Sequence, residues 1–269
     1  MDVTTLAVAT DLMITRWGSE VTDRGPYLLV RTPDEPDFWF GQALVVPPPA
    51  PAEPGPAWLA RWQASFEREL PAATHRALVV DGDVSSAVEA AATAAGWAVQ
   101  RNVASSARAL AEAPPPAGVE VRPLASDRDW AQVVALALAS DEHDAAPDRP
   151  VDELHRRFVR GRVASKRAWV EAGRGAWWGA LAGDALVGSL GVVGEGELAR
   201  YQDVVTHPAW RRRGVARALL TAAGRAALDR GARRLVIVAI AGGDPLRLYR
   251  AAGFAPADTS VELLRRPPA

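Results

Sequence analysis

The stretch HPAWRRRGVARALLTAAGRAALDRG, residues 207–231, contains an arginine-rich turn followed by an amphipathic helix. Its second half carries apolar residues at helical spacing, and Gly231 ends the pattern as a C-terminal cap glycine does. The arginines before it lie between a strand and the first turn of the helix, where backbone N–H groups have no intrahelical acceptor. Such a turn binds anions, because the helix dipole and the guanidinium groups supply positive charge and Gly214 lets a phosphate approach the backbone. The stretch therefore predicts a pyrophosphate site at a strand-to-helix turn. The apolar positions of the helix are Ala216, Leu219, Leu220, Ala223 and Ala227.

The segments around this turn predict a mixed sheet. In chain order we expect a strand over 119–125, helices over 127–140 and 151–164, strands starting at Ala176, Ala185 and Leu198, the helix described above, a strand over 235–240, a helix over 244–252 and a strand ending near Arg266. Gly183-Asp184 is a hairpin signal, and LVIVAI at 235–240 is continuously apolar, as a strand buried on both faces is. The order β-α-α-β-β-β-α-β-α-β is typical of the α/β class. The second helix is expected to bury a face made of Val151, Leu154, Phe158 and Val159.

Length and proline placement predict two domains. The chain has 269 residues, which corresponds to about two domains at roughly 150 residues each. Prolines cluster at 47–56 and 113–118, and such clusters do not lie inside helices or central strands. Placing the boundary at the second cluster predicts domains over 1–113 and 117–269.

Composition excludes several classes of function. The chain has no cysteine, which excludes disulfides, thiolate metal sites and a cysteine nucleophile. Its formal net charge of -1 opposes a general nucleic-acid-binding protein. No run approaches the roughly 18 apolar residues of a membrane span, and the N-terminal segment lacks the basic region of a signal peptide. We therefore expect a cytoplasmic protein without nucleic-acid or membrane partners.

Two motifs in order carry a resemblance to a known family. Arg211, Gly214 and Ala216 match Gln/Arg-x-x-Gly-x-Gly/Ala, and LYRAAGF at 248–254 matches LYxxxGF. The turn lacks the Gly-Lys-Ser/Thr of a P-loop and the three glycines of a dinucleotide fingerprint, which disfavours nucleoside triphosphates and NAD. Over residues 119–266 the chain resembles the GNAT superfamily of acyl-CoA-dependent N-acyltransferases. The resemblance implies the GNAT fold.

The resemblance also implies where an acyl-CoA lies. Pantetheine is expected along the strand Val204-Val205-Thr206, in the manner of an added strand, because this strand splays from its neighbour. The pyrophosphate is expected on backbone N–H groups at about 213–217, and the acyl carbonyl in the opening between the two strands. An amine then attacks directly, and Tyr249 lies near the sulfur as the acid for the leaving thiolate. The implied cofactor-binding residues are Val204, Val205, Thr206, Arg211, Arg212, Arg213, Gly214, Val215, Ala216 and Arg217, and no metal is implied.

Several of these positions have a structural alternative. Successive arginines are common at solvated helix ends, and a tyrosine such as Tyr249 is common as a packed core residue. His207 precedes a proline and is interpreted as a strand-end residue. The acidic run DEHD at 141–144 is interpreted as a loop between two helices, because adjacent residues converge poorly on one metal ion.

The sequence does not assign the general base. The strand positions expected to face the acceptor are Arg200 and Gln202, and neither accepts a proton well at neutral pH. Asp203 has the opposite parity, so only a strand bulge turns it to the same side. A water relay to a distant carboxylate and an amine that arrives neutral are the alternatives. An Arg200 that faces the pocket favours an amine that carries a carboxylate.

The N-terminal half repeats the order of elements found over 203–254. Predicted strands at 41–46 and 76–80 alternate with helices at 57–70 and 84–95, and AAGWAV echoes AAGFAP. The prolines at 47–56 replace the arginine turn and offer no N–H to a phosphate, and Ala92 stands where Tyr249 stands in the other half. We interpret the chain as a tandem of a degenerate and a competent GNAT-like domain. An unrelated α/β domain is the alternative for the first half.

These observations predict an acetyl-CoA-dependent N-acetyltransferase that acts on a primary amine of a small molecule. The alternative from another class is a module that binds acyl-CoA or mediates an interaction without turnover. The motifs leave open the acceptor, the acyl length and the oligomeric state, because loops carry specificity without shared motifs.

Overall fold

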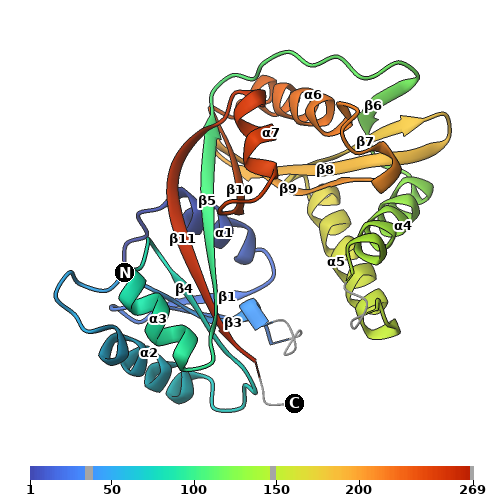
Figure 1. Ribbon diagram of the computed structural model, residues 1–269. Coiled ribbons are helices and arrows are strands. Elements are labelled where there is room, and N and C mark those ends of the chain that lie inside the picture. Colours follow the sequence, from blue (N-terminus) through green and yellow to red (C-terminus); the bar gives the residue numbers. More distant parts are fainter. Residues whose placement is uncertain (34–38, 146–149, 267–269) are drawn as a thin grey trace. The chain divides into compact units, whose positions relative to one another are not determined.

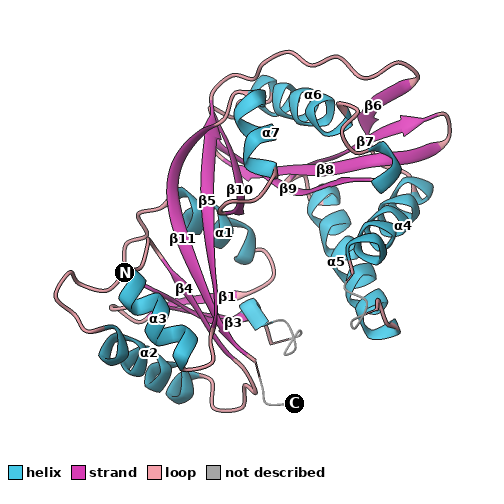
Figure 2. Ribbon diagram, in the orientation of Figure 1, coloured by secondary structure: helices cyan, strands magenta, loops and turns pink. Residues whose placement is uncertain are grey.

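A computed structural model describes residues 1–33, 39–145 and 150–266 (Figures 1 and 2). The chain forms two compact units that do not follow the chain order strictly. Unit 1 comprises Met1–Ser105, Val238–Leu246 and Pro256–Ala269, and unit 2 comprises Ser106–Ile237 and Arg247–Ala255. Compact units are sets of residues in mutual contact and need not fold independently. The domains at 1–113 and 117–269 therefore stay a prediction.

Unit 1 contains a sheet in the order β1-β2-β3-β4-β11-β5. Strands β3 and β4 are parallel, and the C-terminal strand β11 runs antiparallel to β4. The elements of this unit are α1 (Leu6–Thr15), β1 (Glu20–Asp23), β2 (Leu28–Arg31), η1 (Trp39–Gly41), β3 (Gln42–Val46), α2 (Gly55–Glu69), β4 (Arg76–Val80), α3 (Ser86–Ala94), β5 (Ala98–Ala107) and β11 (Ala255–Arg265), with the end of β5 and the first residue of β11 assigned to unit 2.

Alternation along β3 divides the core of unit 1 into two layers. Leu44 packs in the cluster that contains Trp58 and Phe66 of α2. The next residue, Val45, packs with Val8 of α1 on the opposite face. The sheet is therefore covered on both faces, as continuous apolar strands such as RALVV require.

Strand β11 supplies part of this core, which leads to a first prediction. Leu263 is fully buried and pairs with Leu78 of β4. Leu263→Ala is expected to lower the free energy of unfolding by about 2–5 kcal/mol, because it leaves a cavity in a closed core. Chemical denaturation followed by tryptophan fluorescence measures the loss. The control Arg265→Ala lies on the same strand at an exposed position and is expected to change stability by less than about 0.5 kcal/mol. Equal effects of the two variants would contradict the packing of β11 in unit 1.

Unit 2 contains a sheet in the order β10-β9-β8-β7-β6. The order of strands and helices along 119–265 is the predicted one, and the mixed α/β fold is confirmed. The elements are β6 (Val119–Pro123), α4 (Asp127–Asp144), α5 (Glu153–Glu171), β7 (Gly175–Ala182), β8 (Ala185–Glu195), β9 (Leu198–Thr206), η2 (Pro208–Trp210), α6 (Val215–Asp229), β10 (Arg234–Ile240) and α7 (Pro245–Ala252), with the end of β10 and the start of α7 assigned to unit 1.

Helices cover both faces of the unit 2 sheet. Helices α4 and α5 lie on one face, and α6 lies on the other (Figure 1). Trp130 of α4 and Val163 of α5 pack against Trp177 of β7. The opposite face is covered by the apolar stripe of α6, in which Leu219 and Leu220 are fully buried. This arrangement leaves the ends of the strands, rather than their faces, available for chemistry.

Two local expectations about the helices are wrong. Helix α4 continues through Asp144, so the acidic run 141–144 is its last turn and not a loop. Helix α5 begins at Glu153 and buries Val159, Val163 and Lys166. Leu154 and Phe158 lie away from that stripe and are 72% and 46% exposed. Among the described residues, no helix is long and apolar enough to cross a membrane.

Candidate functional site

The pairing between β9 and β10 ends within the strands. Only three parallel pairs join them, from Leu198↔Arg234 to Arg200↔Val236, although both strands are described over their full lengths. On its other side β9 stays paired with β8 up to Thr206. Within the described residues, the segment 204–206 therefore has an edge toward β10 that no strand pairs. An extended ligand with amide groups can add to such an edge.

The turn that follows this open edge has an unusual backbone. Arg212 has a φ of 65° and Gly214 a φ of 87°, so both lie in the left-handed region. Glycine adopts this region without strain, which accounts for the residue at 214. A side chain placed there would meet only Pro116, whose Cγ lies 3.9 Å from the added Cβ. The space in front of the turn is thus open to a group that approaches the backbone.

Helix α6 begins at this turn without a side-chain cap. Its first N–H groups are those for which a helix provides no acceptor, and the helix dipole adds partial positive charge there. Val215 at its first position is buried, and Ala216 follows it into the helix. The turn and the helix start therefore have the geometry of an anion site.

The arginines of the turn have different partners. Arg211 forms a bidentate ion pair with Asp144 of α4, with N···O distances of 2.8 and 2.6 Å. The Arg211 guanidinium lowers the pKa of the Asp144 carboxyl. The Arg213 guanidinium lies 5.2 Å from the centre of the Trp210 ring. Arg217 donates to the Glu112 carbonyl at 3.3 Å. Arg211 thus fastens the turn to α4, while its neighbours remain at the surface of the turn.

This ion pair yields a second prediction. If Arg211 acts by holding the turn, Arg211→Ala and Asp144→Ala should each weaken CoA binding by about three- to tenfold, and the double variant should be no weaker than either. Isothermal titration calorimetry of CoA measures all three dissociation constants. An Asp144→Ala variant that binds CoA more tightly than the wild type would show instead that Asp144 competes with the phosphates for Arg211.

The acidic run 141–144 forms ion pairs rather than a metal site in the described part of the chain. Asp141 lies 2.8 Å from His155, and Glu142 pairs with Arg156. No group of three or more histidine or carboxylate side chains that could hold a metal ion is found among the described residues.

Tyr249 lies on α7 and is buried. Its ring meets Phe254 edge to face at 6.3 Å, and Phe254 meets Tyr201 in the same way at 5.5 Å. Burial raises the pKa of Tyr249 to about 12, and the positive charge of Arg200 opposes this rise. The hydroxyl is therefore protonated at neutral pH. Tyr249 packs as a core residue does, and its role as an acid stays a prediction.

A bulge interrupts the pairing of β8 with β9 beside the open edge. Gly191 is paired with Gln202 and Ser189 with Val205, so Leu190 faces two residues of β9 instead of one. Asp203 lies in the bulge with a φ of 45°. The regular alternation of side chains along a strand predicted that Arg200 and Gln202 face the acceptor. This alternation is interrupted at the bulge.

Asp203 contacts Lys166 of α5, a residue that sequence reasoning did not single out. Lys166 is the only lysine of the chain and is 4% exposed. Burial, together with the nearby Arg162 guanidinium and against the opposing charge of Asp141, lowers the pKa of Lys166 to about 7. Its position on the apolar stripe of α5, in a chain with abundant arginine, was the signal available in the sequence.

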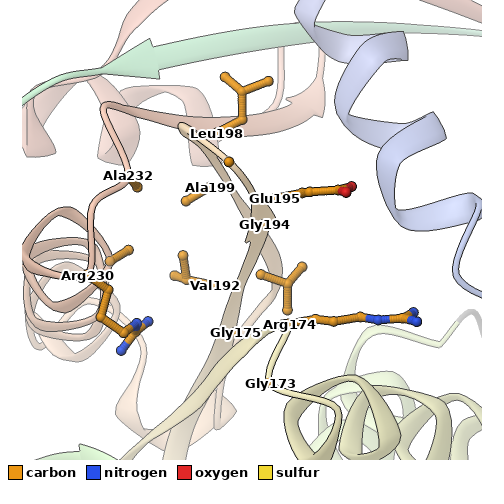
Figure 3. A pocket seen from close by; sticks show the side chains of 13 residues that line it. Gly173, Arg174, Gly175, Val192, Gly194, Glu195, Leu198, Ala199, Arg230 and Ala232 are labelled. Carbon is orange, nitrogen blue, oxygen red and sulfur yellow. The ribbon is translucent and has the colours of Figure 1, made fainter.

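A separate pocket of about 220 Å³ lies near the other end of α6. In Figure 3 the side chains of Val192 and Ala199 project to one side of the strands, and those of Arg174 and Glu195 project to the opposite side. None of the predicted site residues lines this pocket, and it lies at the C-terminal end of α6 rather than at Gly214. Its lining residues are Gly173, Arg174, Gly175, Val192, Val193, Gly194, Glu195, Gly196, Leu198, Ala199, Ala227, Arg230 and Ala232.

Comparisons with known proteins agree with this geometry. Residues 173–256 match the model of the Acetyltransferase (GNAT) domain. A GCN5-related N-acetyltransferase from Kribbella flavida is 21% identical, with a TM-score of 0.63 over 98% of this chain and 95% of its own. A conserved protein of unknown function from Staphylococcus epidermidis ATCC 12228 is 12% identical, with a TM-score of 0.75 over 96% of this chain and 97% of its own.

A two-domain relative is also similar. A tandem GNAT protein from the clavulanic acid biosynthesis pathway is 18% identical, with a TM-score of 0.50 over 79% of this chain and 70% of its own. No curated protein matches the chain. At these identities the structures show a shared fold, and the matching family model adds the family. The chain therefore has the GNAT fold, and its residues 173–256 match the GNAT acetyltransferase domain.

Proposed function

We propose that this protein is an N-acetyltransferase that moves an acetyl group from acetyl-CoA to a primary amine of a small molecule. The observation that carries the proposal is the open edge of β9 over 204–206, followed directly by the uncapped start of α6. An acyl-CoA has amide groups that suit the edge and a pyrophosphate that suits the helix start. The family match makes an acyltransferase of this type the natural assignment.

The roles of the residues follow from this placement. Val204, Val205 and Thr206 would bind pantetheine through their backbone. The N–H groups near Arg213, Gly214 and Arg217 would bind the pyrophosphate, with Arg212 at the turn surface. Tyr249 would donate a proton to the sulfur as the thiolate leaves, because a phenol with a raised pKa stays protonated at neutral pH. The other residues of the turn, Arg211, Val215 and Ala216, would hold it in shape.

Unit 1 is proposed not to bind acyl-CoA. Its helix α2 occupies the place of α6 in the repeat and begins after Pro54, with Pro56 in its first turn, so it offers fewer N–H groups. A Cβ on Gly55 would lie 3.0 Å from the Val88 backbone of α3. The space in front of this helix start is therefore filled within unit 1, whereas the space in front of Gly214 is open. This difference supports a degenerate repeat.

A second candidate function is a module that binds acyl-CoA without turnover. One observation favours it, because the carboxylate of Asp203 at the bulge is already engaged by Lys166. A carboxylate held in this way is a weak base on its own.

Two measurements on the full chain separate the candidates. Calorimetry measures CoA binding, and a thiol-release assay with acetyl-CoA measures turnover against a panel of amines with and without a carboxylate. We expect micromolar binding and thiol release that depends on one class of amine. CoA binding without thiol release for any amine would favour the binding module, and absence of CoA binding would refute both.

A further inference from the structure

Resting on the proposed function, we propose that Asp203 and Lys166 act as one proton-accepting pair for the attacking amine. Asp203 contacts the amine and receives its proton. Lys166, uncharged in the reactive form, takes the proton up through Asp203. In this scheme Asp203 is the catalytic residue and Lys166 is a positioning residue that sets its proton affinity.

The geometry of the bulge places Asp203 for this role. It directly precedes the open edge at 204–206, where the acyl group of a bound acyl-CoA would lie. Its left-handed backbone breaks the strand parity, so its side chain no longer points where a regular strand would send it. The side chain is 34% exposed, so one part meets Lys166 and another part meets solvent. A carboxylate that is about one third exposed can exchange a proton with an incoming amine.

Lys166 is held in a pocket that disfavours its charge. It is 4% exposed, and its Nζ lies 5.6 Å from the centre of the Trp177 ring. That ring packs closely on β8, because a Cβ on Gly191 would lie 2.1 Å from it. Desolvation of this kind removes the preference of an amine for the protonated form. Burial thus excludes water from the Lys166 amine, while the Trp177 ring, which attracts a cation, only partly offsets the loss of hydration.

The charged groups around Lys166 come from three elements. Arg162 lies on α5 itself and reaches Asp203 at 3.8 Å. Asp141, on α4, raises the pKa of Lys166 through its negative charge and is itself paired with His155. On β9 the group is Asp203, and the part of β7 packed against α5, residues 175–182, carries no ionisable side chain. With Lys166 neutral, Arg162 and the two carboxylates leave one net negative charge, and the proton that the pair takes up brings the local charge to balance.

The proton inventory of the step is balanced. The neutral amine nitrogen forms a bond to the thioester carbon, and the carbonyl electron pair moves to oxygen. The nitrogen, now positive, loses a proton to Asp203 and thence to Lys166, which becomes an ammonium paired with the carboxylate. When the oxyanion reforms the carbonyl, the C–S bond breaks and the sulfur takes the proton of Tyr249. Transfer of the proton from Lys166 to the tyrosinate through solvent restores both groups.

The first test uses the fact that the chain has one lysine. Protein labelled with [ε-13C]lysine gives one lysine side-chain signal, which can be followed by NMR from pH 5 to 11. We expect a midpoint near 7, the pKa to which burial lowers Lys166. In Asp203→Asn the midpoint should fall by about 1–3 units, because the neighbouring negative charge is removed. A wild-type midpoint near the ordinary lysine value of about 10.4 would overturn the proposal.

The second test compares kcat with the lysine titration. Because the neutral amine of Lys166 is the reactive form, kcat should rise with pH through the midpoint measured by NMR and level off above it. Two acceptor amines whose own pKa values differ by about 2 units should give the same midpoint in kcat. A midpoint that moves with the acceptor would assign the titration to the substrate and overturn the role of Lys166.

Variants separate a proton acceptor from an ion pair that only holds the structure. Lys166→Arg keeps the positive charge beside Asp203, but a guanidinium does not release its proton. We expect both Lys166→Arg and Lys166→Met to lower kcat by roughly 10²-fold and to abolish the rise near pH 7, with CoA affinity unchanged. Arg167→Met, at the next position and paired with Asp127 and Glu171 at the surface, is the control and should retain full activity.

The outcomes are distinct. Rescue by arginine to within about threefold of the wild-type kcat would show a structural ion pair and overturn the proposal. If neither Lys166 variant folds, the wild-type NMR titration and its coincidence with kcat still decide the question. Absence of thiol release with every amine would refute the proposed transferase and, with it, the role of Asp203 and Lys166. An active enzyme whose Lys166 titrates near the ordinary lysine value would refute the role of the two residues alone.

Discussion

Tyr249→Phe is expected to lower kcat by roughly 10²-fold while the dissociation constant of CoA changes by less than about threefold. The substitution keeps the ring that packs on Phe254 and removes only the hydroxyl. A departing thiolate with a solution pKa near 8.5 leaves more readily when a donor supplies a proton. Because burial raises the pKa of Tyr249 to about 12, the donor form is present throughout the neutral range. Steady-state kinetics and calorimetry measure the two quantities.

The matched control for this variant is Tyr201→Phe. Tyr201 also packs edge to face on Phe254, and its hydroxyl donates to the Leu220 carbonyl at 2.7 Å. Its loss is expected to lower stability by about 1 kcal/mol and to leave kcat unchanged. Undiminished kcat in Tyr249→Phe, with the chemical step limiting the rate, would make Tyr249 a core residue. Loss of CoA binding with the fold intact would make it a cofactor contact.

Gly214→Glu is expected to raise the dissociation constant of CoA by more than about 100-fold. The new carboxylate would lie in the open space before the turn, where the pyrophosphate is proposed to bind. Its negative charge would repel the negatively charged phosphates. Any non-glycine residue at a φ of 87° also costs about 1 kcal/mol or more in backbone strain. Calorimetry measures the affinity, and thermal unfolding confirms that the variant is folded.

Two controls separate charge from strain in this experiment. Gly183→Glu introduces the same carboxylate at a left-handed glycine in the hairpin between β7 and β8, where an added Cβ meets no atom within 4 Å. It should leave CoA affinity unchanged. Gly214→Ala carries the strain without the charge and should weaken binding by no more than about tenfold. Unchanged affinity in Gly214→Glu would remove the cofactor site from this turn.

Local pattern predicted most of the fold. Helical spacing, the hairpin glycine at 183 and the apolar run at 235–240 each depend on neighbours along the chain, and the expected start of β9 at Leu198 is confirmed. The residue pattern of a strand does not identify the strands with which it pairs. No partner was predicted for the last strand, and β11 pairs with β4 of unit 1, because complementary apolar faces and not sequence distance decide which edge a strand joins.

The candidate site was predictable only in part. The turn 211–214 follows from residue types whose chemistry does not depend on distant neighbours. The bulge at Asp203 does depend on them, since one extra residue in β9 is accommodated only when β8 is in place. Aspartate tolerates the left-handed region better than most residues, which was a weak signal for the bulge. Lys166 was missed because a charged residue on a helix is ordinarily assigned to solvent.

The place of β11 also has a consequence for the order of synthesis and folding. Strand β4 at Arg76–Val80 pairs with residues that follow it by about 180 positions. At about 5–20 residues per second, a ribosome needs roughly 10–40 seconds to supply that partner. During this interval β4 lacks its native neighbour on one edge, and the nascent N-terminal segment exposes an unpaired strand. Chaperones that shield strand edges would therefore act on the first half of this chain, while unit 2, whose strands β6 to β10 lie close together in sequence, completes its pairing sooner.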